Sequence, residues 1–161
     1  MRVRATVAYD GTAYGGWQLQ PGVMTVQERI ETVLAQLDGV RPKIHGSGRT
    51  DRGVHARGQV FHVDLVQTFE PADLIRGMNA LLPEDIRIRA CARTSHTFHA
   101  RRNAVWKEYR YNIWNGPAVP PDLRLYRTRC VRPLNAAAMR AAAACLVGRH
   151  DFAAFAANPN R

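Results

Sequence analysis

A loop over residues 46–56, with the sequence GSGRTDRGVHA, places one carboxylate among glycines and cations. Its glycines permit positive φ angles and close approach of the backbone to a ligand, and Asp51 lies at its centre. Arg49, Arg52 and His55 supply donors around it, and a nearby arginine is expected to keep the carboxyl group ionised. An ionised carboxylate flanked by cations is a suitable nucleophile. This is therefore a candidate active-site loop; the alternative is a polar turn whose aspartate bonds its own backbone.

Two phosphate-binding motifs with similar glycine spacing are excluded by the same residues. A Rossmann fingerprint needs a third glycine where Asp51 stands and a helix after it, whereas residues 59–65 have the pattern of a strand. A P-loop needs Lys followed by Ser or Thr after its last glycine, and the chain has Val54 and His55 there. The loop therefore predicts neither dinucleotide nor nucleoside triphosphate binding.

The chain is strongly basic. Its 161 residues carry a formal net charge of +10, which favours a polyanionic partner because basic surfaces attract phosphates through steering and counterion release. Nucleic acid is the first candidate. Lys43 and Lys107 are the only lysines, so arginine supplies nearly all of the positive charge. A GC-rich genome explains the preference for arginine over lysine but not the net charge, and arginine also suits phosphate recognition and base stacking.

Cysteine and histidine spacing argues against a metal centre. Cys91, Cys130 and Cys145 are widely separated and form no Cys-x-x-Cys pair, which excludes a disulfide framework and a structural zinc site. His55 and His62 have no cysteine or clustered carboxylates beside them, so we expect them to face solvent or to brace a loop. The sequence has no apolar signal core and no run long enough to span a bilayer. These features predict a cytoplasmic protein outside the membrane.

Hydrophobic periodicity predicts a first domain over residues 1–100. Apolar residues alternate with polar ones in its strands and recur at helical spacing in its helices. The predicted order is strand 2–9, helix 25–39, strand 41–45, strand 59–65, helix 71–82 and strand 86–92. This βαββαβ order is typical of the ferredoxin-like α+β fold. Two helices then cover one face of an antiparallel sheet, and the other face stays free for a ligand or another domain.

Residues 101–161 predict the start of a second α+β lobe. A strand over 107–114, a turn over 115–117 and an alanine-rich helix over 135–147 are expected there. No further strand follows that could pair with the preceding ones. The second lobe is therefore expected to be incomplete.

Aromatic residues of the chain have two possible uses. Arg101, Arg102, Lys107 and Arg110 interleave with rings, the mixture expected along an RNA cleft; a solvated charged strand face is the alternative. The tryptophans Trp17 and Trp106 could stack on RNA. We expect packing for both, because large aromatics beside apolar strands usually fill a core or an interface.

Several separated motifs share their order and spacing with one protein family. They are Asp10-Gly11 with Tyr14-Gly15-Gly16-Trp17-Gln18, the loop Gly48–Ala56, Phe98-His99-Ala100-Arg101, Tyr109-Arg110-Tyr111 and Asp151-Phe152-Ala153-Ala154-Phe155. With these motifs the chain resembles the TruA family of tRNA pseudouridine synthases. The resemblance implies isomerisation of uridine to pseudouridine at positions 38–40 of the tRNA anticodon arm, without cofactor or metal. It also implies a homodimer, with tRNA lying across clefts that both subunits build.

The same resemblance implies roles for three residues. Asp51 matches the catalytic aspartate, whose carboxylate attacks either the sugar or the base before the uracil turns and rejoins through carbon. Tyr109 matches a tyrosine that stacks on the target base, and its alternative place is the core, beside Tyr111 on one strand face. Arg49 matches an arginine near the flipped nucleotide, and its alternative role is to brace Asp51. Because the target uracil must leave its stack, base flipping is an expected step.

Members of this family typically continue for roughly another hundred residues, which complete the second lobe and supply a basic residue that pairs with the aspartate. Two hypotheses other than an enzyme therefore remain for this chain. One is a non-catalytic RNA-binding module made of the ferredoxin-like lobe and its basic surface. The other is a fragment that associates through an exposed sheet edge.

Overall fold

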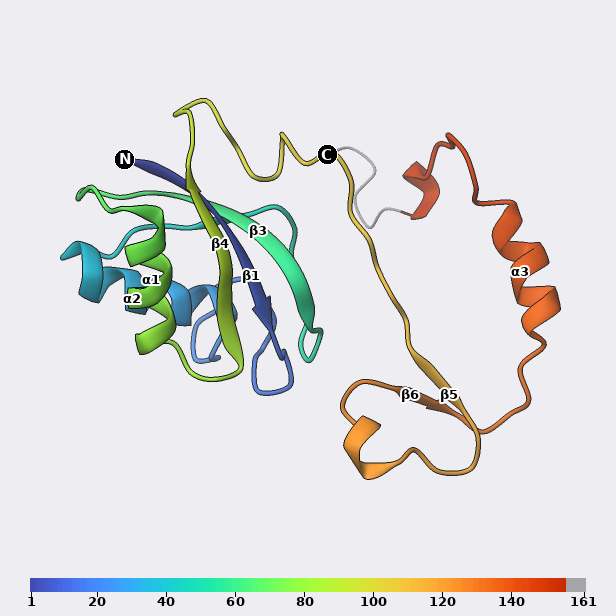
Figure 1. Cartoon of the computed structure of the whole chain (residues 1–161). Helices are drawn as coiled ribbons and strands as arrows, with labels where there is room; N and C mark the ends of the chain where they lie inside the picture. The colour runs from blue at the N-terminus through green and yellow to red at the C-terminus, as the bar shows by residue number, and fades with distance from the viewer. Residues whose placement is uncertain (156–161) are drawn as a thin grey trace. The chain divides into compact units, whose positions relative to one another are not determined.

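The computed structural model describes residues 1–155 and divides into two compact units between Glu108 and Tyr109 (Figure 1). Residues 156–161, at the end of the second predicted domain, lie outside the described residues. Among the residues that are described, no helix is long and apolar enough to cross a membrane.

The first unit is a four-stranded sheet with two helices on one face (Figure 1). Its elements follow the order β1 (Arg2–Tyr9), α1 (Val26–Asp38), β2 (His45–Gly46), β3 (Ala56–Asp64), α2 (Pro71–Leu81) and β4 (Ile86–Arg93). The strands lie in the order β2-β3-β1-β4, and every neighbouring pair is antiparallel. The α+β class and the ferredoxin-like βαββαβ order are thus confirmed.

The central strand β1 contributes every second residue to the hydrophobic core. Val3, Ala5 and Val7 are buried, and the side chains between them face the other side of the sheet. β1 pairs with β3 along one edge and with β4 along the other, so that Ala5 lies opposite both Phe61 and Cys91. This alternation is the period-2 pattern that the sequence predicts for a half-buried strand.

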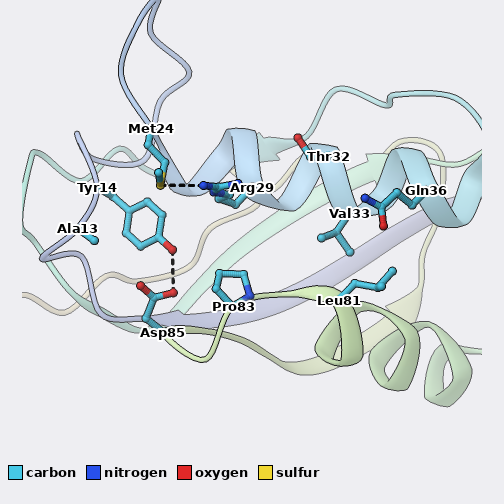
Figure 2. A pocket seen from close by; sticks show the side chains of 10 residues that line it. All are labelled: Ala13, Tyr14, Met24, Arg29, Thr32, Val33, Gln36, Leu81, Pro83 and Asp85. Atoms are coloured by element: carbon cyan, nitrogen blue, oxygen red, sulfur yellow. Dashed lines mark hydrogen bonds between the residues drawn. The ribbon is translucent and has the colours of Figure 1, made fainter.

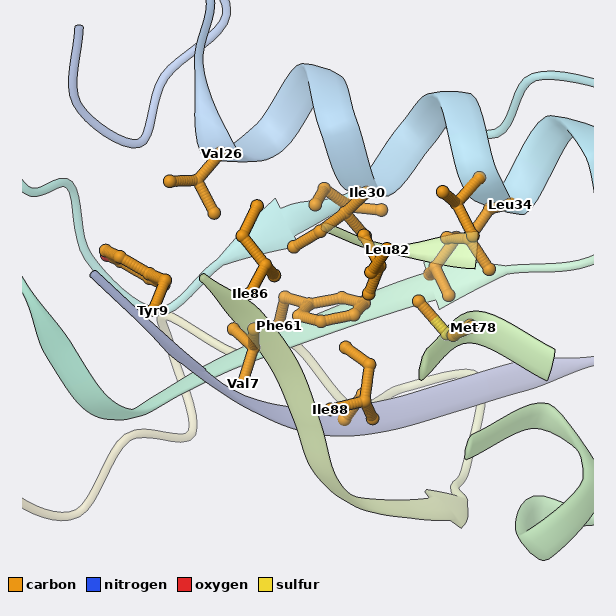
Figure 3. Close-up of a cluster of buried hydrophobic side chains, with 14 of the residues drawn as sticks. Val7, Tyr9, Val26, Ile30, Leu34, Phe61, Met78, Leu82, Ile86 and Ile88 are labelled. Atoms are coloured by element: carbon orange, nitrogen blue, oxygen red, sulfur yellow. The ribbon is translucent and has the colours of Figure 1, made fainter. Parts of the chain in front are cut away.

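Helix α1 begins and ends at its capping residues. The side chain of Thr25 accepts a hydrogen bond from the Glu28 amide at 3.3 Å, and Gly39 closes the helix with a φ of 78°. Between these residues, Ile30 and Leu34 are buried and point toward the sheet, as Figure 3 shows. Helix α2 covers the same face, with proline in its first turn.

Two strands differ from their predicted bounds. The predicted strand over 41–45 is wrong except at its last residue, since β2 is His45–Gly46. The amide of Ile44 donates at 3.1 Å to the buried carboxylate of Glu31 in α1 and not to a neighbouring strand. β3 begins earlier than predicted, since Ala56 pairs with Tyr9 beyond an irregularity in the register.

The second unit contains a short parallel strand pair and one helix. β5 (Ile113–Asn115) pairs with β6 (Thr128–Cys130), α3 spans Ala136–Ala144, and single 3-10 turns cover Pro121–Leu123 and Ala153–Phe155. The predicted strand over 107–114 is wrong for most of its length, since residues 104–112 form no regular element. A strand needs a partner along its length, and β6 offers β5 only three paired residues.

Helix α3 starts where the Asn135 side chain accepts a hydrogen bond from the Ala138 amide at 2.9 Å. It ends at Ala144, before the predicted Val147, because the following amides bond to carbonyls three residues earlier in 3-10 geometry. Within the described part of this unit, no large apolar side chain is buried. Residues 109–155 of the second unit therefore form no hydrophobic core of their own.

Candidate active site

The loop that carries Asp51 joins β2 to β3 beside the C-terminal end of β1. Its first turn is tied to β3. The Ser47 amide donates to the Val60 carbonyl at 2.7 Å, and the Gln59 side chain donates to the Gly48 carbonyl at 2.6 Å. The Ser47 hydroxyl in turn donates to the Gln59 side-chain oxygen at 2.6 Å. The strand thus holds the entry to the loop.

Thr50, the residue before Asp51, is hydrogen-bonded to the last residue of β1 and to the segment that follows this strand. The Tyr9 hydroxyl and the Thr50 hydroxyl are hydrogen-bonded at 2.8 Å, and the Trp17 amide donates to the Thr50 carbonyl at 3.0 Å. Gly16, at a φ of 101°, lies against the same carbonyl, because an added Cβ would approach that oxygen to 2.5 Å. Burial raises the pKa of Tyr9, so its phenol stays protonated at neutral pH.

The exit from the loop rests on the same segment. The Gly53 amide donates to the Tyr14 carbonyl at 3.4 Å, and a side chain at Gly11 would collide with the Val54 carbonyl. The imidazole of His55 accepts a hydrogen bond from the Gly11 amide at 3.2 Å and lies 3.1 Å from the Asp10 carboxylate. The role of His55 as a loop-bracing residue is therefore confirmed.

Asp51 itself is exposed at the top of this supported loop, and so are Arg49 and Arg52. The Val54 amide donates to the Asp51 carbonyl at 3.2 Å, which closes a turn around the carboxylate-bearing residue. In the described part of the chain, neither arginine forms an ion pair with Asp51. The expected set of donors around Asp51 is therefore wrong as it stands: both arginines are exposed, and the Nδ1 atom of His55 lies beside the Gly11 amide and the Asp10 carboxylate.

A lysine distant in sequence also lies near this loop. The ammonium group of Lys107 lies over Gly48, 3.5 Å from the position that a Cβ there would occupy. Lys107 belongs to the first unit and precedes Tyr109 by two residues. The interleaving of cations and rings marks Lys107 as a cation for RNA, but no spacing in the sequence places it beside Asp51.

The motif over residues 98–101 is attached to the free face of the sheet by histidines. His62 of β3 is only 3% exposed, so the solvent-facing alternative is wrong for it. It accepts a hydrogen bond from the Ala100 amide at 3.1 Å and so braces the loop over residues 98–101, as the other alternative predicts. Its ring stacks on His45 at 5.0 Å and meets His99 at 4.8 Å. Burial and these neighbours lower the pKa of His62 to about 4, which leaves the ring neutral at pH 7.

This cluster of three imidazole rings does not form a metal centre. The Nδ1 atoms of His62 and His99 are both used for backbone contacts, as when His99 accepts from the Arg101 amide at 3.2 Å. Arg4 adds a cation over the Phe98 ring, 5.9 Å from its centroid. Within residues 1–155, no group of three or more histidine, cysteine, aspartate or glutamate side chains could hold a metal ion.

The aromatic residues singled out in the sequence divide between core and surface. Trp17 is buried against Tyr9, so its predicted packing is confirmed. Trp106 is 76% exposed, so it does not pack in a core, and packing at an interface stays a prediction for it. Tyr109 is 68% exposed and Tyr111 is more exposed still, so neither ring is packed in a core within the described residues. Asp51 and Arg49 share one loop of the first unit, whereas Tyr109 is the first residue of the second.

A hollow of about 460 Å³ lies between α1 and the turn after α2 (Figure 2). The Tyr14 hydroxyl donates to Asp85 at 2.7 Å at its floor, and burial together with that carboxylate raises the pKa of Tyr14. Arg29 lies across it with its guanidinium 3.2 Å from the Met24 sulfur. No residue of the Asp51 loop lines this hollow. The candidate active site is thus the exposed loop and not this cavity.

Comparison with known proteins agrees with the motifs. A family model described as tRNA pseudouridine synthase matches residues 5–102. A tRNA pseudouridine synthase A from Rhodospirillum rubrum is 46% identical over 159 residues, covering 98% of this chain and 57% of the relative. Proteins of the same name from Streptococcus thermophilus and Gloeobacter violaceus are 42% and 44% identical over 159 residues, covering 98% and 96% of this chain and 64% and 51% of the relatives.

The chain spans between about half and two thirds of the length of these relatives. The matched region contains the Asp51 loop, every element of the ferredoxin-like sheet and the segment attached to its free face. The resemblance that the separated motifs indicate is confirmed. This chain belongs to the tRNA pseudouridine synthase family.

Proposed function

We propose that this chain carries the catalytic loop of an enzyme that isomerises uridine to pseudouridine in the tRNA anticodon arm, at positions 38–40. The observation that carries the proposal is the Asp51 loop. Its backbone is fixed at both ends and at Thr50, while the carboxylate-bearing residue is exposed at its top. A rigid support beneath an exposed carboxylate is what a positioned nucleophile requires.

In the proposed reaction, the Asp51 carboxylate attacks either the sugar or the base of the target uridine, and the glycosidic bond from nitrogen to C1′ breaks. The uracil then turns, and its C5 forms a bond to C1′. The proton on C5 is lost, the carboxylate is released, and the nitrogen that left the sugar takes up a proton. Atoms and electrons balance without an oxidant, a metal or a cofactor. Because the reacting atoms of a stacked uridine are out of reach of a protein side chain, the uridine must flip out of its stack to meet Asp51.

Arg49 and Tyr109 are proposed substrate-binding residues. Arg49 is exposed two residues before Asp51, where its guanidinium can reach the phosphate or ribose of a flipped nucleotide. Tyr109 offers an exposed ring, and stacking of one base on such a ring contributes on the order of 1–3 kcal/mol. A tyrosine in the core could not make this contact, so its exposure supports the role.

The proposal extends to the partners of the protein. The net charge of +10 supports tRNA binding, and Arg101, Arg102 and Lys107 are exposed beside the motif on the free face of the sheet. We also propose a cytoplasmic homodimer with tRNA across clefts from both subunits. The uncovered apolar side chains of the second unit, such as Val147, support an arrangement in which further protein covers them.

Tritium release from tRNA labelled at uridine C5 tests the enzyme directly. We expect the unmodified chain to release tritium and the Asp51→Asn variant to release none, because the amide is not a nucleophile. Asp51→Asn should bind tRNA as before, since it leaves the basic surface intact. Tritium release by Asp51→Asn would contradict the assignment of the nucleophile.

A second function, that of a non-catalytic RNA-binding module, is favoured by the charge alone. It predicts salt-dependent tRNA binding by both proteins and tritium release by neither. The same two proteins in the same assay thus separate the two functions. Association into large species on a sizing column, without tRNA binding, would favour the fragment with an exposed sheet edge.

A further inference from the structure

Tyr9 has a polar partner in a place where its strand needs none. It is the last buried residue in the alternating row of β1, is 4% exposed, and packs its ring on Trp17 at a centroid distance of 6.0 Å. An apolar ring would fill this space equally well. The hydroxyl group is instead hydrogen-bonded to the Thr50 hydroxyl at 2.8 Å, which removes the cost of burying it.

Thr50 is the point at which this contact reaches the candidate nucleophile. Its hydroxyl meets Tyr9, and its carbonyl accepts from the Trp17 amide at 3.0 Å. One peptide bond separates it from Asp51, so a shift of Thr50 moves the carboxylate with it. In the described part of the chain, Tyr9 is the only residue whose side chain is hydrogen-bonded to any of residues 49–52.

The other contacts of the loop do not depend on Tyr9. Ser47 is bonded to β3, and Gly53 is bonded to the Tyr14 backbone. Without the Tyr9 hydroxyl, the loop would keep both ends but lose the side-chain contact closest to Asp51. The consequence is a displaced carboxylate and not an unfolded loop.

We propose that Tyr9 is a positioning residue, which sets the location of Asp51 through its hydrogen bond to Thr50. This inference rests on the proposed function for the catalytic part of its test. It assigns to the motif at the end of β1 a task that neither the sequence nor the family membership gives it. Tyr9 acts through Thr50 and does not itself touch the substrate.

Amide hydrogen exchange tests the positioning without any turnover. The reporter is the Val54 amide, which donates to the Asp51 carbonyl and closes the turn. We expect Tyr9→Phe to speed exchange at this amide about fivefold to tenfold, the loss of one buried hydrogen bond. Tyr14→Phe is the matched control, because Tyr14 is also buried and loses a bond of 2.7 Å, but to Asp85 and not to the loop.

An equal effect of the two tyrosine variants on Val54 exchange would overturn the inference. So would an unchanged rate in Tyr9→Phe. Amides in the centre of β3, such as that of Phe61, report global stability in the same experiment. A rise there that matches the rise at Val54 would mean that Tyr9 only stabilises the fold, which also counts against positioning.

The kinetics of tritium release provide a second test of the positioning role of Tyr9. Tyr9→Phe and Thr50→Val should each lower kcat about fivefold to tenfold with little change in KM, because a misplaced carboxylate weakens the chemical step and not tRNA binding. The double variant should be no worse than either single variant, since both remove one contact. Thr50→Ser keeps the hydroxyl and should restore kcat.

Asp51→Asn separates failure of the inference from failure of the proposed function. If Asp51→Asn keeps releasing tritium, the nucleophile assignment fails, and the Val54 exchange alone decides the structural coupling of Tyr9. If Asp51→Asn is inactive while Tyr9→Phe keeps both kcat and slow Val54 exchange, the nucleophile stands and the positioning role of Tyr9 is refuted.

Discussion

Replacing Gly16 with alanine measures how closely the segment after β1 approaches the Asp51 loop. Gly16 has a φ of 101°, and an added Cβ would lie 2.5 Å from the Thr50 carbonyl oxygen. Real Cβ contacts essentially never fall below 3.0 Å, so the loop must retreat by about 0.5 Å. Two costs follow: the strained backbone, about 1–2 kcal/mol, and the overpacking, about 1–3 kcal/mol.

Two further glycines separate these costs. Gly22 has a φ of 70° with open space around it, so Gly22→Ala should lose only the backbone part, about 1–2 kcal/mol. Gly58 has no positive φ, and an added Cβ would meet only the Thr6 methyl at 3.7 Å, so Gly58→Ala should be close to neutral. All three variants change the unfolded chain in the same way, and that contribution cancels in the comparison.

The assay is equilibrium unfolding in urea, followed by tritium release from labelled tRNA. Gly16→Ala should lower the free energy of unfolding by about 1–3 kcal/mol more than Gly22→Ala does. A shift of half an ångström at Thr50 should also reduce kcat by on the order of tenfold. If Gly16→Ala is no less stable and no less active than Gly22→Ala, the loop does not rest on Gly16 as described.

Two other predictions concern the stability of the first unit. Because the pKa of His62 is lowered from its ordinary value to about 4, the unfolded chain binds the proton more readily, so stability should be full above pH 6.5 and fall as the pH drops toward 4. Urea midpoints between pH 4 and 7 should show this slope, and His62→Phe should flatten it; an unchanged slope in that variant would assign it to other groups. Glu31→Ala should lower the free energy of unfolding by about 1–3 kcal/mol, because it leaves the buried amides of Ile44 and Gln27 without their acceptor. Glu31→Gln keeps an acceptor oxygen, so its free energy of unfolding should fall less. If both variants lose the same free energy of unfolding in urea, the negative charge of Glu31 and not its acceptor oxygen is responsible.

The first unit follows its local sequence signals closely, and the exceptions have side-chain causes. β1 has the bounds that its alternation predicts, and α1 begins and ends at the capping residues that the sequence predicts. β2 is short because Glu31, which is thirteen residues before Ile44 in the chain, takes the amide that a strand would use. Periodicity identifies Glu31 only as a polar position of a helix, so the sequence does not predict its contact with the Ile44 amide.

In the second unit, the hydrophobic pattern predicts only part of the observed structure. Residues 107–114 have strand composition, yet most of them form no regular element, since strand formation depends on a partner that pattern alone does not supply. The alanine-rich helix predicted over 135–147 does form as α3, although none of its residues is buried.

For the candidate site, the sequence locates the loop but not its contacts. Glycines and charges around Asp51 mark it from their types alone. Which cation lies near it depends on tertiary structure: His55 turns to Asp10, and Lys107 approaches Gly48. The sequence does not predict the contact of Tyr9 with Thr50. Alternation identifies Tyr9 only as an inward-facing residue, and no local pattern shows whether its hydroxyl group has a hydrogen-bond partner.

The supports of the Asp51 loop all come from an early part of the chain. The hydrogen bonds and close approaches that fix its backbone join it to residues 9–17 and to residues 59–60. During synthesis, the residues that make these contacts therefore leave the ribosome before α2, β4 or any part of the second unit. Substitutions in the second unit can therefore accumulate without removing a contact that holds the backbone of the Asp51 loop.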